Sequence, residues 1–181
     1  MTTPAIYIEP ILCSDTLSRR EAEQQASLTL ARRIAGPDAV IEHYPDGAPY
    51  IPGFSGHISL THCSTLAAIA VSSSPHIGID AEIWRPQLQR VASKFLSPAQ
   101  LPYWSASPLR LLFAWTIKEA VYKAARTPGL PLHNITLPSA ATLSALSSPS
   151  TPLISSTPDS RQWRISVIAT SPVFITAVNK I

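Results

Sequence analysis

The chain has 181 residues, of which 45% are hydrophobic and 14% charged, and its formal net charge is +3. Low charge and ample apolar residues favour a collapsed chain over disorder, and the length fits one large domain or two small halves that share a core. The charge is a mild bias toward anionic partners, and without a run of Lys or Arg it excludes a typical nucleic-acid-binding surface.

The sequence carries no sign of export, membrane insertion or disulfide bonding. The N-terminus lacks a basic region followed by an apolar run, so we expect no signal peptide. No stretch of about 20 uninterrupted apolar residues predicts a spanning helix. Cys13 and Cys63 have neither CxxC spacing nor the number needed for a disulfide framework. We therefore expect a protein of the reducing cytoplasm that binds no membrane.

The first part of the chain predicts one strand, one helix and three further strands. The first strand, "AIYIEPIL", is followed by a helix over 14–36, capped by Ser14 or Asp15 and ended by a Gly-Pro pair. Pro, Asp and Gly predict a turn over 45–50. The other strands are expected, in chain order, at 39–44, 57–63 and 66–73.

The second part predicts a strand, three helices, another strand and a final pair of strands. Ser107 is the expected cap of the longest helix, with Pro108 at its first position. A stretch over 138–160, rich in Ser, Thr, Pro and Ala, predicts a long surface loop or hairpin tip. The remaining elements are strands at 76–83, 133–137, 161–169 and 172–179, and helices at 85–96, 97–106 and 107–126. Together they indicate an α+β fold with antiparallel sheets and helices packed on them.

Two carboxylates stand out in the strand "IGIDAEIW". Asp80 and Glu82 are two residues apart, so their side chains project from the same face of the strand, while the isoleucines and Ala81 face the core. Two carboxylates projecting together repel each other unless a cation lies between them, and Mg²⁺ prefers such oxygen ligands. Taken alone, the pair is explained more simply as an exposed strand face that is merely acidic.

The helix segment "LLFAWTIKEAVYKAA" carries one acid, Glu119, in nearly apolar surroundings. Two stripes recur at helical spacing, and only a narrow sector around Lys118 and Tyr122 is left to face water. Glu119 lies on the flank of Trp115, where an unpaired charge is costly. Lys123 follows one turn later, so the two form either a surface ion pair or a third oxygen ligand beside a phosphate-binding lysine.

These motifs together resemble a known family. "GIDAE", followed about 35 residues later by "WTIKEAVYKA", resembles the paired signature of the 4′-phosphopantetheinyl transferases. "SLTHC", "DGAPYIP" and "RVASKFLSPAQ" are similar to that family's histidine segment, its G-[KR]-P turn and the stretch between its acidic motifs. About 75 residues precede the acidic motif, which resembles the surfactin-synthetase-activating (Sfp-type) subfamily.

The resemblance implies a fold and a division of the chain. The expected fold is that of the 4′-phosphopantetheinyl transferases, in which two similar α+β halves form an intramolecular pseudo-dimer with antiparallel sheets. Residues 1–75 would be the coenzyme A-binding half and residues 76–181 the half with the metal-binding acids and helix, packed as one globular unit. Since one chain holds both halves, we expect a monomer.

The resemblance also implies an activity. Such enzymes transfer the 4′-phosphopantetheine arm of coenzyme A to a serine of an apo acyl or peptidyl carrier protein and release adenosine 3′,5′-bisphosphate. Asp80, Glu82 and Glu119 would hold Mg²⁺, and Mn²⁺ fits the same ligands. The expected catalytic residues are Asp80, Glu119 and Lys123, with Glu119 or a metal-bound water accepting the serine proton and Lys123 meeting a phosphate.

The coenzyme itself would be held by a second set of residues. By the resemblance, Thr61 and His62 bind its ribose 3′-phosphate, and Gly47 and Pro49 shape the turn near the adenine. His62 alone would be read as a hydrogen-bonded structural residue. A nucleophilic pair of Cys63 with His62 is disfavoured, because neighbours on a strand point to opposite faces.

The chain also departs from the family pattern. Ala48 stands where a basic residue is common, which leaves one contact to the coenzyme phosphates unfilled, and Thr61, Cys63 and Ala81 are further replacements. Two other functions therefore remain open at this stage. One is a relative that binds carrier proteins or coenzyme A without turnover, and the other is a Mg²⁺-dependent phosphohydrolase.

Overall fold

A computed structural model describes residues 3–14, 16–139, 153–170 and 172–181. The first half contains β1 (Ala5–Pro10), α1 (Arg19–Ala35), β2 (Glu42–His43), β3 (Pro49–Tyr50), β4 (His57–His62) and β5 (Leu66–Ser72). The second contains β6 (Ile77–Ile83), α2 (Gln87–Phe95), α3 (Leu101–Trp104), α4 (Pro108–Ala125), the 3-10 helix η1 (Leu132–Asn134), β7 (Leu153–Ser156), β8 (Gln162–Thr170) and β9 (Val173–Lys180).

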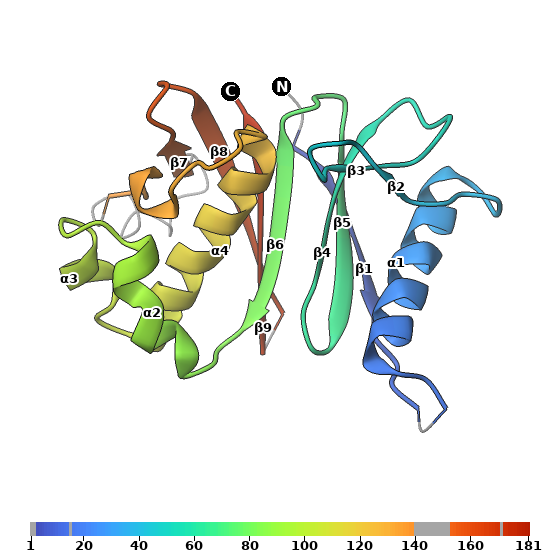
Figure 1. Cartoon of the computed structure of the whole chain (residues 1–181), viewed down its shortest axis with the longest axis horizontal. Coiled ribbons are helices and arrows are strands. Elements are labelled where there is room, and N and C mark those ends of the chain that lie inside the picture. The colour runs from blue at the N-terminus through green and yellow to red at the C-terminus, as the bar shows by residue number, and fades with distance from the viewer. Residues whose placement is uncertain (1–2, 15, 140–152, 171) are drawn as a thin grey trace.

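The two halves repeat one topology. In the first, the strand order is β1-β5-β4, and in the second it is β6-β9-β8, extended by β7. In each half the first strand pairs with the last strand, and all of these pairings are antiparallel. The long helices α1 and α4 lie on opposite flanks of the molecule, with the strands between them (Figure 1). The fold is therefore α+β with antiparallel sheets, as the sequence predicts.

Three apolar cores hold these layers together. One lies between α1 and the first sheet, and another between the second sheet and α4 with α2 and α3. The third lies between the sheets and joins the halves. It contains alternate residues of β6 and their counterparts on β5 and β9, namely Ile77, Ile79, Ala81, Ala68, Ala70, Ile175 and Ala177. The alternation predicted for the acidic strand is confirmed, since its apolar face lies in this core.

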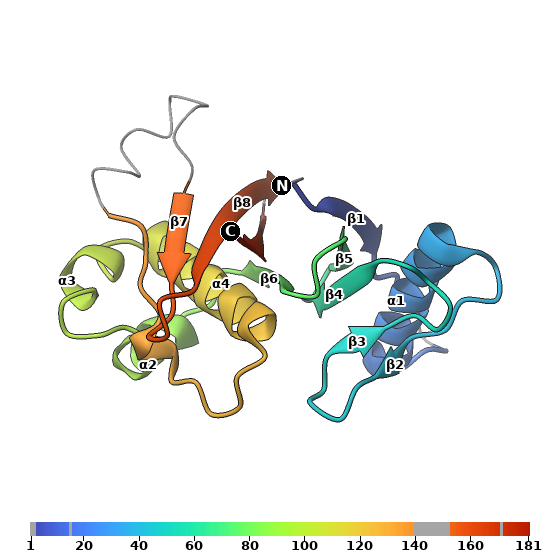
Figure 2. The same ribbon diagram turned by 90° about the horizontal axis from the view of Figure 1, so that it is seen from above.

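Hydroxyl groups join the two sheets where β4 meets β6 at the centre of the molecule (Figures 1 and 2). The amide of Ile79 donates to Ser59 Oγ at 3.1 Å, and the amide of Ala81 donates to Thr61 Oγ1 at 3.2 Å. Both hydroxyl residues are buried. They satisfy edge amides that would otherwise be left unpaired between two sheets. We call this line of contacts the hydroxyl seam.

Gly78 lets α4 approach β6 more closely than any other residue would. A Cβ atom built at this position would lie 1.9 Å from the backbone oxygen of Ala120 and 2.9 Å from the amide nitrogen of Ala124. Both are backbone atoms of α4, so no rotation of a side chain can relieve the clash. The glycine of "GIDAE" therefore sets the distance between the acidic strand and the helix that carries Glu119 and Lys123.

Most predicted elements agree with the structure, and the long helix begins as expected. Ser107 caps it by accepting a hydrogen bond from the amide of Arg110 at 3.3 Å. The first helix begins later than predicted, because its cap is Ser18, which forms a reciprocal capping box with Glu21. No helix in the described part of the chain is both long and apolar enough to cross a membrane.

Two predictions for the second half were wrong. The segment predicted as a strand at 133–137 contains no strand, and η1 occupies its start. The region predicted as a loop over 138–160 contains β7, while residues 140–152 of that region lie outside the described residues. The short helical piece predicted within 97–106 is confirmed as the four-residue helix α3.

Candidate active site between the two halves

Asp80 lies at the centre of the molecule, on the face of β6 that is turned toward α4. It is only 7% exposed. Its Oδ1 atom accepts hydrogen bonds from Lys123 Nζ at 2.9 Å and from Thr61 Oγ1 at 3.3 Å. Lys123 also donates to the carbonyl of Ile79 at 2.9 Å. Residues of β4, β6 and α4 thus hold one oxygen of this carboxylate in place.

The second carboxylate oxygen of Asp80 has no partner. Oδ2 is buried and accepts no hydrogen bond from the described residues. A buried, unpaired carboxylate oxygen is costly unless a cation or a donor meets it. Asp80 Oδ2 is therefore the kind of ligand that a hard divalent cation takes.

Glu82 and Glu119 lie near enough to Asp80 for the charges to affect one another. Burial, followed by the negative charge of Asp80, raises the pKa of Glu119 above its ordinary value. Burial also raises the pKa of Glu82, although the nearby Arg85 opposes this effect. Glu82 Oε1 accepts from Arg85 Nη2 at 2.8 Å and from Trp115 Nε1 at 3.3 Å. The structure thus brings the three predicted acids into one negative region.

The three carboxylates do not converge on one point. Within the described ranges, no three His, Cys, Asp or Glu side chains stand close enough to enclose a metal ion. Asp80 is turned toward Lys123, and Glu82 is turned toward Arg85. Each carboxylate that pairs with a cation has thereby reduced its repulsion from the others.

The sequence predicts that Lys118 faces water, but the side chain is buried. Its side chain is 0% exposed, and Nζ donates to the carbonyls of Leu132 at 2.8 Å and Ile135 at 2.6 Å. Burial lowers the pKa of Lys118 to about 7. The sector of α4 expected to face water is covered here by the chain that follows the helix. The lysine anchors that returning segment, which begins with the pocket residues Thr127 to Gly129.

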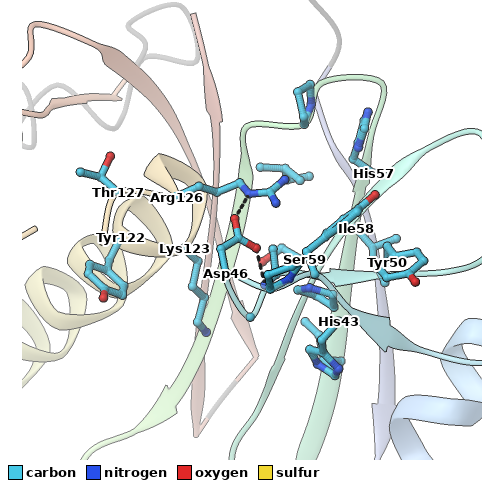
Figure 3. A pocket seen from close by; sticks show the side chains of 18 of the residues that line it. His43, Asp46, Tyr50, His57, Ile58, Ser59, Tyr122, Lys123, Arg126 and Thr127 are labelled. Atoms are coloured by element: carbon cyan, nitrogen blue, oxygen red, sulfur yellow. Dashed lines mark hydrogen bonds and ion pairs between the residues drawn. The ribbon is translucent and has the colours of Figure 1, made fainter. Parts of the chain in front are cut away.

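A pocket of about 580 Å³ opens between the end of α4 and the β2–β3 turn (Figure 3). This volume is within the usual range for small-molecule sites, about 300–1,000 Å³. Lys123 and Arg126 are the two lysine or arginine residues among its described lining residues. Tyr44 and Tyr50 contribute stacked rings with centroids 4.4 Å apart. The pocket therefore offers both cations and aromatic surface beside Asp80.

The residues predicted to hold coenzyme A are divided by the structure. Gly47, Pro49 and Lys123 line the pocket. Thr61 does not line it, because its buried hydroxyl bonds to Asp80 and to the amide of Ala81. His62 lines a second pocket, which shares His43 and Leu60 with the first, and its Nδ1 lies 3.6 Å from a carboxylate oxygen of Glu23.

Sequence reasoning missed two charged residues of the pocket. Arg126 Nε donates to Asp46 Oδ2 at 2.7 Å, across the gap between the end of α4 and the β2–β3 turn (Figure 3). Hydrogen bonding from Arg126 lowers the pKa of Asp46. The pair joins residues 80 positions apart, so no local pattern could have indicated it.

The family comparison agrees with this geometry. Residues 76–178, more than half of the chain, match the sequence model of the 4′-phosphopantetheinyl transferase superfamily. The chain therefore belongs to this superfamily, whose activity in general is the transfer of phosphopantetheine. The matched region contains Asp80, Glu82, Glu119 and Lys123. A comparison with curated proteins found no match.

Proposed function

We propose that this protein transfers the 4′-phosphopantetheine arm of coenzyme A to a serine of an apo acyl or peptidyl carrier protein, with Mg²⁺ or Mn²⁺ as the cofactor. The observation that carries the proposal is the unpaired, buried Oδ2 of Asp80 in the family-matched region. The other oxygen of Asp80 accepts from Lys123, which lines a pocket that offers two cations. A divalent cation would pair with Oδ2 of Asp80, and an anionic coenzyme would pair with Lys123.

The residues that would hold the cation are Asp80, Glu82 and Glu119. Asp80 offers its unpaired oxygen, while Glu82 would exchange its bond to Arg85 for the metal. Bound there, the cation would neutralise the charge that shifts onto the diphosphate of coenzyme A as its bond breaks.

The reaction requires an attacking oxygen, a proton acceptor and a leaving group. The serine oxygen of the carrier attacks the phosphorus that bears the pantetheine arm and forms a new P–O bond, while the bond to the other phosphate breaks. Adenosine 3′,5′-bisphosphate leaves with the electron pair. Glu119 accepts the serine proton, because burial and the neighbouring acids make it a stronger base than an ordinary glutamate. Lys123 meets a diphosphate oxygen as a point charge.

We further propose that the chain is of the Sfp type, with residues 1–75 as the coenzyme A-binding half and residues 76–181 as the half that carries the acids. Two observations support this. The first sheet repeats the strand order of the second, and the pocket is lined from both halves. Because one chain then supplies a whole site, we expect it to act as a monomer. We also propose that it acts in the cytoplasm.

A transfer assay tests the proposed function. The protein is incubated with coenzyme A, Mg²⁺ and a panel of apo carriers of the fatty-acid, polyketide and nonribosomal-peptide types, and mass spectrometry detects the added arm. We expect transfer to at least one carrier. Asp80→Asn and Glu119→Gln are expected to lower kcat at least about a hundredfold, since each removes a charge that the reaction uses.

Asp38→Asn is the matched control, because Asp38 is exposed and lines neither pocket, and it should leave the rate unchanged. Binding of coenzyme A without transfer to any carrier would identify a non-catalytic relative instead. Phosphate release in the absence of a carrier would identify a phosphohydrolase.

A further inference from the structure

Arg126 ends α4 in a backbone conformation that is unusual for its residue type. It lies in the left-handed region, with φ at 51° and ψ at 36°. This conformation is unfavourable for a non-glycine residue, which keeps it only where the surroundings fix it. Here the surroundings are the β2–β3 turn, toward which the side chain extends across the pocket (Figure 3).

Two contacts hold the guanidinium of Arg126. Nε donates to Asp46 Oδ2 at 2.7 Å, and the guanidinium carbon lies 5.0 Å from the ring centroid of Tyr44. Asp46 is fixed in turn, because its Oδ1 accepts from the amide of Ala48 at 3.1 Å. Asp46 and Tyr44 of the turn thus fix the position of the guanidinium.

The rest of the guanidinium is uncommitted. Among the described residues, no hydrogen bond or ion pair involves the two terminal nitrogens of Arg126. The side chain is partly exposed, at 27%, and lines the pocket. A planar guanidinium with free terminal donors is suited to the two-pronged recognition of a phosphate.

The two cations of the pocket serve different ends of it. Lys123 reaches back to Asp80 and the acids. Arg126 begins three residues later, about 4.5 Å farther along the helix axis, and reaches the β2–β3 turn. A donor whose diphosphate lies at Lys123 would therefore place a second, remote phosphate near Arg126.

The residues expected to hold that remote phosphate, Thr61 and His62, do not line this pocket. The hydroxyl of Thr61 is used within the hydroxyl seam. His62 lies beside the carboxylate of Glu23, whose charge would repel a phosphate, and it does not line the pocket. Ala48 supplies no cation from the turn.

We propose that Arg126, positioned by Asp46, binds the ribose 3′-phosphate of coenzyme A and makes the enzyme prefer coenzyme A to its 3′-dephospho form. This inference rests on the proposed function. Arg126 is the residue in contact with the phosphate, and Asp46 acts through it.

Two donors and one informative variant test the inference. The affinity and KM of the full-length protein are measured with coenzyme A and with 3′-dephospho-coenzyme A, each in the presence of Mg²⁺, with calorimetry for binding and the transfer assay for kinetics. Arg126→Gly removes the side chain, and glycine adopts the left-handed conformation without strain, so this variant should fold. Thermal unfolding of each variant verifies that it does.

We expect Arg126→Gly to weaken the binding of coenzyme A about ten- to a hundredfold, which is the range for a charged hydrogen-bonded pair. It should scarcely change the affinity for 3′-dephospho-coenzyme A, so the preference of the wild type for the phosphorylated donor should disappear. The loss should appear in KM and not in kcat. Arg126→Lys should recover part of the preference, because it restores the charge without the planar donor pair. Arg32→Ala, an exposed change of the same charge outside both pockets, is the control.

If Arg126→Gly weakened the binding of coenzyme A and of 3′-dephospho-coenzyme A equally, the inference would be overturned, because Arg126 would then act on the shared diphosphate or only on the fold. An unchanged affinity for coenzyme A would overturn it as well. In both cases a wild type that transfers the arm leaves the proposed function standing. A wild type that binds neither donor would overturn both proposals.

Discussion

Glu82 and Glu119 are unusual because burial and the charge of Asp80 both oppose their ionisation. Asp80 is buried with one unpaired oxygen, and the pKa values of Glu82 and Glu119 are raised. Such perturbed groups in a cleft are typical of functional sites. They also make a definite contribution to the pH dependence of folding.

We expect the free energy of unfolding to decrease as the pH rises above about 4.5 when divalent cations are absent. Raised pKa values mean that folded Glu82 and Glu119 hold protons that their unfolded forms have lost. Their stabilising contribution is therefore complete below the ordinary pKa and is lost as the pH passes through the folded values. Urea unfolding between pH 4.5 and 6.5 measures this slope, in a range below the pKa of about 7 of Lys118.

Glu119→Gln should flatten the slope, since the neutral amide no longer titrates. Mg²⁺ should stabilise the wild type more at pH 6.5 than at pH 4.5, because only ionised carboxylates attract it strongly. A Glu119→Gln profile that superimposes on that of the wild type would contradict this interpretation.

The sequence pointed to acids that the structure brings near one another, but not to what surrounds them. Spacing alone left the roles of Asp80, Glu82 and Glu119 open, and the resemblance to the transferase family singled them out. The burial of Lys118 could not be predicted, because a helical projection considers only one helix, and the segment that covers this lysine follows at 127–135. The partnership of Arg126 with Asp46 likewise depends on how two distant turns meet.

Among the elements, the packing of α4 on β6 controls the geometry of the site. Strand β6 carries Asp80 and Glu82, and α4 carries Glu119 and Lys123. The contact between them is close because Gly78 has no side chain. A substitution that separates the two elements would therefore move the acids apart as well as destabilise the fold.

Gly78→Ala is expected to lower the free energy of unfolding by about 2–3 kcal/mol, the upper part of the range for overpacking. For a chain of this size, that corresponds to a Tm lower by about 4–12 °C. Gly56→Ala is a suitable comparison, because its added Cβ would meet the ring of Phe54 at 2.6 Å, and that ring can move. Calorimetry should show a clearly smaller loss for Gly56→Ala. Equal losses would mean that α4 shifts freely on β6.

Helix starts could be predicted where a complete capping signal was considered. Ser107 followed by Pro108 is such a signal, and it is confirmed. The start of α1 was placed too early, although Ser18 and Glu21 form the S-x-x-E pattern of a capping box. The strand predicted at 133–137 failed for another reason. The carbonyls of Leu132 and Ile135 accept from Lys118. The backbone hydrogen bond that joins this segment to β7 is the one from the amide of Thr136 to the carbonyl of Ser156.

The whole molecule consists of two halves that meet at the central core and the hydroxyl seam. Their common topology is not visible as a repeat in the sequence, because equivalent strands share a pattern of burial and not a set of identical residues. The connection between the halves, Ser73 to Pro75, is short and mostly exposed. The halves are therefore joined by contacts far more than by this linker.

We expect fragments 1–74 and 75–181 to associate when they are expressed together and to recover as a one-to-one complex in size-exclusion chromatography. Each fragment alone would expose its side of the central apolar core and should aggregate. Two fragments that stay soluble and separate would show that the central core does not hold the halves together.

Exchange of two amide protons in the hydroxyl seam reports on the contact between the halves. The amides of Ile79 and Ala81 are bonded to Ser59 and Thr61 and not to a strand carbonyl. Hydrogen–deuterium exchange at these two positions therefore reports opening between the sheets. Ser59→Ala should accelerate exchange at Ile79 while exchange at Ala81 remains slow. Thr61→Val should accelerate exchange at Ala81 while exchange at Ile79 remains slow. The two amides therefore report separately on the two bonds of the seam.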